Sequence, residues 1–267
     1  MRVPLKSIAI FLLLFLYALV SLGIMALPAG RARRLARLTG NVMFFARIGL
    51  RVLGIRVHFH CMKRKGLRKR HTHYLIIANH LTYADILVVA SLMPSVFITS
   101  VELKHTFPLG LFAWLGGCLF VERRSPAGLK REIEEIANVL AQGTSVVLFP
   151  EGTTSNGDTV RPVRNSLITA ALMTGTSLLP VCSRYRAANG RKVDQTNRDS
   201  LSYYGGTTVF QHLPRFLALR SIDVECVILR PITTHQNQSR KDLATRTHQM
   251  ISAAYHERPA GIVNTVI

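Results

Sequence analysis

Two kinds of apolar segment alternate along most of this chain. Short runs typical of buried strands include YLIIANH (74–80), SVFITS (95–100), SVVLFP (145–150) and SLLPVCSRY (177–185). Longer segments with helical spacing lie between them. One of these begins at Ser125 and Pro126, ends near Gly143 and places Leu129, Ile133, Ile136 and Leu140 on one face. Strands separated by helices of this length imply an α/β domain whose sheet is mostly parallel and flanked by helices.

Further segments complete this expected order. RVHFH (56–60), GGCLFVERR (116–124) and SIDVECVILRPI (221–232) are expected to be strands. The segments 85–92, 163–174 and 241–256 are expected to be helices, the second of them stopped by Gly175, and 187–200 a polar loop. We therefore expect one catalytic domain over residues 56–267, preceded by a separate region over residues 1–55.

The N-terminal region contains an uncharged run, Ser7–Leu27, of 21 residues. About 20 apolar residues cross a bilayer core of about 30 Å, so a transmembrane helix is predicted. A cleaved signal peptide is the alternative. It fits less well because its apolar run is ordinarily about 7–15 residues long and ALPAG (26–30) is a poor cleavage site. The basic residues that follow favour a cytoplasmic position for the main domain; they are Arg31, Arg33, Arg34 and Arg37.

Two basic segments follow this run. Residues 35–55 alternate basic and apolar side chains at helical spacing, which fits either an amphipathic helix lying on a membrane or a helix packed on the core. Residues 63–73, KRKGLRKRHTH, form a basic turn-like segment. It suits anionic headgroups, and it equally suits a solvated hairpin tip.

The overall charge indicates an anionic partner. The chain has 34 Lys and Arg against 14 Asp and Glu, a net charge of +20, and 48% of its residues are hydrophobic. A disordered basic tail would be poor in apolar residues, so this is a folded basic protein. Charge alone fits nucleic acid or an anionic membrane surface, and the N-terminal run favours the membrane and not nucleic acid. The four cysteines are widely spaced without a C-x-x-C pair, which is typical of free thiols in a reducing compartment.

A histidine and an aspartate interrupt the apolar segment 75–92. His80 follows a predicted strand, and Asp85 lies five residues later where a helix is expected to begin. A carboxylate placed there can accept a hydrogen bond from one imidazole nitrogen and leave the other free to take a proton from a substrate hydroxyl. A structural His–Asp bond beside a helix N-terminus explains the pair equally well.

A second polar segment, LFPEGTTSNG (148–157), also follows a predicted strand. Its turn offers backbone N–H groups to an anion, and Glu151 offers a carboxylate to a hydroxyl or an amine. The alternative is an ordinary tight turn, for which these residue types are also well suited.

Together these segments resemble the conserved blocks of the glycerolipid acyltransferase family, which includes 1-acyl-sn-glycerol-3-phosphate acyltransferases. NHLTYAD supplies the first block, a His-x4-Asp spacing matched by His80 and Asp85. FPEGT (149–153) supplies the third, and LLPV, with Pro180, the fourth. The second block is KHTFPLGLFAWLGGCLFVER, which matches the family through Lys104, Pro108, Gly110, Gly117 and Arg123.

The resemblance implies roles for particular residues. His80 would be the general base and Asp85 the residue that orients it. The acceptor's headgroup would be held by five residues of the second and third blocks: Lys104, Arg123, Glu151, Gly152 and Thr153. No metal and no cofactor is implied, because acyl-CoA or acyl carrier protein is consumed as the acyl-donor substrate.

Two positions depart from the usual family pattern. Thr154 stands where the family often has an arginine, and Glu122 where it often has an aspartate. The Thr154 form, with YYGG at 203–206, is similar to a bacterial branch that also includes lyso-ornithine lipid acyltransferases. The expected acceptor is 1-acyl-sn-glycerol-3-phosphate, giving phosphatidate, with lyso-ornithine lipid as the alternative. The expected location is the bacterial inner membrane, with the catalytic domain on its cytoplasmic face.

Other functional classes have less support. The chain has no G-x-S-x-G, no Walker loop, no G-x-G-x-x-G and no H-E-x-x-H. The histidine pairs His58/His60 and His71/His73 could be metal ligands, but no third ligand accompanies them. The alternative from a different class is a basic membrane-binding protein with this fold that has lost catalytic activity.

Overall fold

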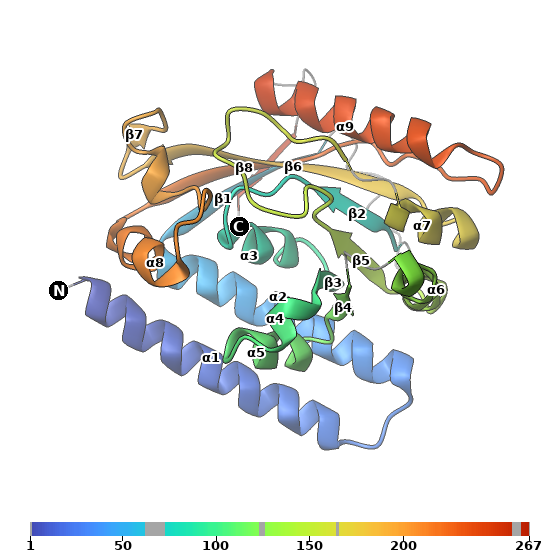
Figure 1. Ribbon diagram of the computed structural model, residues 1–267. Coiled ribbons are helices and arrows are strands. Elements are labelled where there is room, and N and C mark those ends of the chain that lie inside the picture. The colour runs from blue at the N-terminus through green and yellow to red at the C-terminus, as the bar shows by residue number, and fades with distance from the viewer. Residues whose placement is uncertain (1, 62–72, 123–125, 164–165, 258–262, 267) are drawn as a thin grey trace.

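The described strands form one mixed sheet with helices on both faces (Figure 1). The computed structural model describes residues 2–61, 73–122, 126–163, 166–257 and 263–266. The strand order is β4-β3-β5-β2-β6-β8-β1-β9, and β7 pairs with β6. Neighbouring strands from β4 to β6 are parallel, as are β8 and β1, whereas β6–β8, β1–β9 and β6–β7 are antiparallel. The predicted α/β class with a mostly parallel sheet is confirmed.

The bounds of the elements are as follows. The strands are β1 Ile55–Cys61, β2 Leu75–Ala78, β3 Ser95–Ser100, β4 Leu119–Val121, β5 Ser145–Leu148, β6 Leu178–Ala188, β7 Arg191–Lys192, β8 Ile222–Ile228 and β9 Val263–Val266. The helices are α1 Arg2–Ala26, α2 Arg31–Leu53, α3 Ala84–Ala90, α4 Val101–Lys104, α5 Leu109–Leu115, α6 Pro126–Ala141, α7 Thr169–Thr174, α8 Val209–Ala218 and α9 Arg240–His256.

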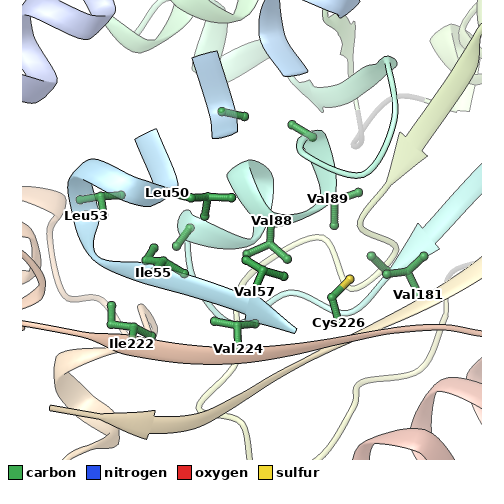
Figure 2. Packing of buried hydrophobic residues seen from close by; sticks show 14 of the residues in the cluster. Leu50, Leu53, Ile55, Val57, Val88, Val89, Val181, Ile222, Val224 and Cys226 are labelled. Atoms are coloured by element: carbon green, nitrogen blue, oxygen red, sulfur yellow. The ribbon is translucent and has the colours of Figure 1, made fainter. Parts of the chain in front are cut away.

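Alternate residues of the central strands enter two separate cores. In β2, Ile76 and Ala78 belong to the core beneath α2, α3 and α8, whereas Leu75 and Ile77 belong to the core beneath α6, α7 and α9. Both faces of the strand are therefore covered, which is why it reads as a continuous apolar run. Figure 2 shows the first core, where Leu50 and Leu53 of α2 and Val88 and Val89 of α3 meet the sheet through Val57, Val181, Val224 and Cys226.

The N-terminal helices α1 and α2 form an antiparallel hairpin against the α/β domain (Figure 1). The predicted apolar helix is confirmed as α1, which is long and apolar enough to cross a membrane. Both of its halves are bound to the rest of the protein. Lys6 Nζ donates hydrogen bonds to the carbonyl oxygens of Leu53 and Leu219 at 2.7 and 2.6 Å, and Tyr17 Oη donates to that of Phe112 at 3.0 Å. The inner face of α2 packs on the core, the second of the two alternatives left open by its sequence.

Two expected elements differ from the structure. The helix expected over 163–174 is a 3-10 turn, Ser166–Ile168, followed by the short α7, and Gly175 (φ 65°) ends it as predicted. The loop expected over 187–200 contains the end of β6 and its hairpin partner β7. Asn189 and Gly190 have φ values of 55° and 78°, so they form the two-residue turn with positive φ that suits a tight hairpin. Most of the basic segment 63–73 lies outside the described residues.

Candidate active site

The site lies where the parallel strands β2 and β5 end. Residues 79–83 connect β2 to α3, and the loop beginning at Phe149 follows β5. These strands are neighbours in the sheet, so their carboxyl ends bring the first and third sequence blocks together. Asn79 fixes the first turn to β6: its Nδ2 donates to the carbonyl oxygen of Ser183 at 3.0 Å, and its Oδ1 accepts from the Ser183 amide at 2.8 Å.

His80 and Asp85 form the expected pair. The distance from His80 Nδ1 to Asp85 Oδ2 is 3.3 Å. The aspartate is the second residue of α3 and is fully buried, whereas the histidine side chain is 16% exposed. The other ring nitrogen, Nε2, has no hydrogen-bond partner among the residues that the structure describes. A base held at Nδ1 and open at Nε2 can accept the proton of a hydroxyl.

Asp85 also holds the turn that carries the histidine. Its Oδ2 accepts hydrogen bonds from the backbone amides of Leu81 at 2.6 Å and Thr82 at 2.9 Å. Its Oδ1 accepts from the hydroxyl of Tyr185 at 2.9 Å. A buried carboxylate is costly unless such donors replace water, and this one has four.

The loop after β5 holds the backbone of His80 on both sides. The His80 amide donates to Glu151 Oε1 at 3.1 Å, and the His80 carbonyl oxygen accepts from the Ser155 amide at 3.1 Å. The ring of Phe149 stacks on the imidazole with centroids 4.2 Å apart and an interplanar angle of 18°. The third block therefore orients the histidine through its backbone and through its ring.

Glu151 is buried, with 5% of its surface exposed. Burial raises the pKa of its carboxyl group to about 7, partly opposed by the hydrogen bond from the His80 amide and by the nearby Arg161. Its second oxygen, Oε2, is also buried, and the backbone N–H of Arg161 lies near the carboxyl group. This carboxyl group is thus poised to change its charge near neutral pH.

The other expected headgroup residues are less closely grouped. Gly152 (φ 74°) and the exposed Thr153 continue the turn after Glu151. Lys104 is exposed at the end of α4, with its Nζ 5.9 Å from the centre of the Phe120 ring, and in the described part of the chain no hydrogen bond or ion pair joins it to the His–Asp pair. Arg123 lies outside the described residues.

The described residues contain no group of three or more histidine, cysteine or acidic side chains placed to hold a metal ion. Of the two histidine pairs, His58 lies 3.5 Å from Asp223 Oδ1, and His71 is outside the described residues. Cys61, Cys118, Cys182 and Cys226 all lie within the described residues as thiols outside any disulfide bond.

Comparison with known proteins identifies the family. A family model described as Acyltransferase matches residues 55–184, which include the His80–Asp85 pair and the loop of Glu151. A lyso-ornithine lipid O-acyltransferase of Brucella abortus is 30% identical over 217 residues, covering 79% of each chain. The chain belongs to the acyltransferase family. The predicted activity class is therefore confirmed.

Other relatives of this acyltransferase carry two kinds of name. A lyso-ornithine lipid O-acyltransferase of Pseudomonas aeruginosa is 32% identical and covers 67% of each chain. A 1-acyl-sn-glycerol-3-phosphate acyltransferase of Neisseria gonorrhoeae is 26% identical over 179 residues, covering 67% of this chain and 68% of its own. The crystal structure of the acyltransferase PlsC from Thermotoga maritima has the same fold, with a TM-score of 0.67 at 17% identity over 97% of this chain and 98% of that chain.

Three contacts of the acyltransferase site were not expected from the sequence, and the first is the bond from the His80 amide to Glu151 described above. Phe149 lies inside the third block, but nothing in its sequence position indicates that it stacks on His80. Tyr185 ends an expected strand, yet its partner Asp85 is 100 residues away. Only the pairing of β2 with β6 brings the tyrosine to the aspartate.

Proposed function

We propose that this acyltransferase moves a fatty acyl group from a thioester donor to the free hydroxyl of a lysolipid, with His80 as general base and Asp85 as the residue that orients it. The observation that carries the proposal is the bond from Asp85 to Nδ1, which leaves Nε2 open. Nε2 takes the hydroxyl proton while the hydroxyl oxygen attacks the thioester carbonyl carbon. The tetrahedral intermediate collapses by breaking the C–S bond, and the leaving thiolate takes the proton from the imidazolium.

We propose lyso-ornithine lipid as the preferred acceptor. The support is the higher identity to relatives of that name, 29% to 32%, against 26% or 27% for relatives named for 1-acyl-sn-glycerol-3-phosphate. Thr154 in place of the arginine usual in the family agrees with a headgroup that is not a phosphate ester. This reverses the order of acceptors expected from the sequence, and 1-acyl-sn-glycerol-3-phosphate is the second candidate.

The headgroup roles of Lys104, Arg123, Glu151, Gly152 and Thr153 are likewise proposals. Exposed Thr153 and the turn at Gly152 support contact with an acceptor. The burial of Glu151 and its bond to the His80 amide support a role in holding the histidine in addition to any contact with substrate. The reaction as written requires no cofactor, since acyl-CoA or acyl carrier protein supplies the thioester.

We propose that the protein is bound to the inner membrane through residues 1–55, with residues 56–267 as the catalytic part on the cytoplasmic side. The outward face of α1 supports this because large apolar side chains are exposed along it: Leu5, Ile8, Phe11, Leu12, Phe15, Leu16 and Leu19. Phe107 and Trp114 near α5 and Phe210 on α8 are also exposed, and α1 packs against both helices. Exposed apolar area on this scale is typical of a lipid-contacting surface. Contacts along both halves of α1 favour a helix lying along the domain over one that crosses the bilayer alone.

The activity is tested with purified protein in detergent, offered lyso-ornithine lipid and 1-acyl-sn-glycerol-3-phosphate side by side with acyl-CoA and with acyl carrier protein. His80→Ala is expected to abolish product, and the exposed His235→Ala serves as the matched control. Near-normal activity of His80→Ala would contradict the mechanism. If no combination of acceptor and donor gives product with the unmodified protein or with either variant, the alternative of a catalytically inactive membrane-binding protein is favoured.

Membrane contact is tested separately by sedimentation with vesicles. Binding is expected to be stronger to vesicles that contain anionic lipid and to weaken with salt, because the chain carries a net charge of +20. Phe11→Ser combined with Phe15→Ser is expected to weaken binding. Equal binding by this variant and the unmodified protein would count against α1 as the lipid-contacting element.

A further inference from the structure

The hydroxyl of Tyr185 reaches the catalytic pair from a strand that lies outside the two site loops. It donates a hydrogen bond of 2.9 Å to Asp85 Oδ1, across 100 residues of sequence. The mechanism proposed above uses only His80 and Asp85. The position of Tyr185 beside them therefore requires an explanation of its own.

The two oxygens of the Asp85 carboxylate are bonded very differently. Oδ2 accepts from His80 Nδ1 and from the amides of Leu81 and Thr82. Oδ1 has one hydrogen-bond donor among the described residues, which is the Tyr185 hydroxyl. Asp85 is fully buried, so loss of the tyrosine hydroxyl would leave Oδ1 without a hydrogen-bond donor, which costs free energy. Rotation of the carboxylate away from the histidine would break the bond to Tyr185.

The fold fixes where this hydroxyl lies. Two residues before Tyr185, the backbone of Ser183 is bonded on both sides by the Asn79 side chain, directly beside His80. Alternate residues of a strand face the same side, and Val181, four residues before Tyr185, lies in the core that α3 covers, so Tyr185 points to that side of the sheet. The pairing of β6 with β8 shifts register between Tyr185 and Ala187, immediately after the tyrosine.

The tyrosine is held as a hydrogen-bond donor. Burial, and then the nearby charge of Asp85, raise its pKa well above the ordinary value, so the phenol keeps its proton at neutral pH. A neutral donor to a carboxylate forms a charge-assisted hydrogen bond, which is stronger than one between neutral groups.

We propose that Tyr185 is a positioning residue: through Oδ1 it fixes the orientation of the Asp85 carboxylate, and thereby the imidazole orientation and the protonated nitrogen of His80. It does not touch substrate. This inference rests on the proposed function of His80 as general base. It predicts an effect of the Tyr185 hydroxyl on turnover, and little effect on acceptor binding.

The test compares Tyr185→Phe with Tyr204→Phe. Each change removes one hydroxyl bonded to an aspartate, since Tyr204 donates to Asp199 Oδ1 at 2.7 Å near the surface. For Tyr185→Phe we expect kcat to fall about 10- to 100-fold, with KM within about twofold, as for a lost hydrogen bond to a charged group. Tyr204→Phe is expected to match the unmodified enzyme. Equal kcat values for the two variants would overturn the proposal.

The pH dependence of kcat/KM distinguishes positioning from a purely structural role, because a purely structural role of Tyr185 would leave this dependence unchanged in Tyr185→Phe. A carboxylate that has lost a donor attracts a proton onto the neighbouring imidazole more strongly, so the acid limb is expected at higher pH in Tyr185→Phe. The other titratable groups near Asp85 are unchanged by this substitution; they are Glu151, Cys182, Cys226 and Tyr255. An acid limb at the same pH as in the unmodified enzyme would overturn the proposal.

Two further variants separate the possible causes. If Tyr185 acts through Asp85, Tyr185→Phe should cost nothing more when added to Asp85→Asn, and a full additional loss would overturn the proposal. If Tyr185→Phe does not fold, 3-fluorotyrosine at this position keeps the packing and makes a stronger donor. The acid limb should then move to lower pH, and an unmoved limb would overturn the proposal. An active His80→Ala would instead refute the proposed function itself.

Discussion

The backbone amide of His80 is hydrogen-bonded to the side chain of Glu151 at 3.1 Å, across 71 residues of sequence. This bond joins the turn after β2 to the loop after β5 at the residue proposed to move the proton. Because Glu151 is buried, this bond has consequences for stability as well as for catalysis.

The first prediction concerns stability and pH. Because the pKa of Glu151 is raised to about 7 in the folded protein, from 4.5, the folded state binds the proton more tightly than the unfolded state. The free energy of unfolding should therefore fall as pH rises from about 4.5 to about 7, by about 3 kcal/mol from this group. Glu151→Gln, which has no charge to bury, should remove this fall. Denaturant unfolding at several pH values measures it, and the same slope in both proteins would contradict it.

Glu151→Gln and Glu151→Ala also separate two roles of this residue in catalysis. Glutamine keeps an oxygen that can accept from the His80 amide, whereas alanine leaves that amide without its partner. If positioning of His80 dominates, the glutamine variant should retain at least tenfold more kcat than the alanine variant. Equal losses in the two variants would instead indicate that the carboxylate charge itself contacts the substrate.

The second prediction concerns Asp85. Asp85→Asn keeps an oxygen that can accept from the amides of Leu81 and Thr82, so the fold should survive, but it removes the charge that stabilises the imidazolium. A loss in kcat of up to about 10⁴ is expected, the size known for the equivalent change in a serine protease triad. Steady-state kinetics and thermal unfolding on the same sample measure both effects. A variant with full activity would contradict the proposed role.

The third prediction concerns the stacked ring of Phe149. Phe149→Leu removes the aromatic face that lies 4.2 Å from the imidazole and should lower kcat several-fold. Phe97→Leu is the matched control, because Phe97 is also buried and packs near Phe149, with 6.3 Å between their ring centroids. Both variants should lose about 1 kcal/mol or more of stability. Similar kcat values in the two would show that stacking on His80 has no catalytic effect.

The fourth prediction concerns Gly157, in the loop that follows Glu151. It has φ 83°, and a Cβ there would lie 2.7 Å from Leu81 Cδ2, next to His80. Gly157→Ala should therefore lower both stability and kcat. Gly143 has φ 78° but open space around it, so Gly143→Ala should cost only the backbone strain of about 1 kcal/mol and leave kcat unchanged. Unchanged kcat in Gly157→Ala would show that the loop tolerates displacement.

Several elements of the fold were not expected from the sequence, for identifiable reasons. Helix α8 contains Pro214, which ordinarily argues against a helix, yet Thr208 and Gln211 form a capping box at its start. Helices α4 and α5 lie within the second sequence block and are short, with four and seven residues, so periodicity does not identify them. The expected loop 187–200 contains the β6–β7 hairpin, and its sequence sign is Asn189-Gly190, a residue pair typical of tight hairpin turns.

Local sequence patterns predicted the class of fold, the family and the pairing of His80 with Asp85. Each depends on local pattern: alternation of strand and helix segments, and short blocks with fixed spacing. Three contacts became visible only in the folded protein: Glu151 accepts a hydrogen bond from the His80 amide, Phe149 stacks on the His80 ring, and Tyr185 donates to Asp85. These contacts join residues that lie 69 to 100 positions apart in the printed numbering. They depend on strand order and register in the sheet, which local sequence patterns do not specify.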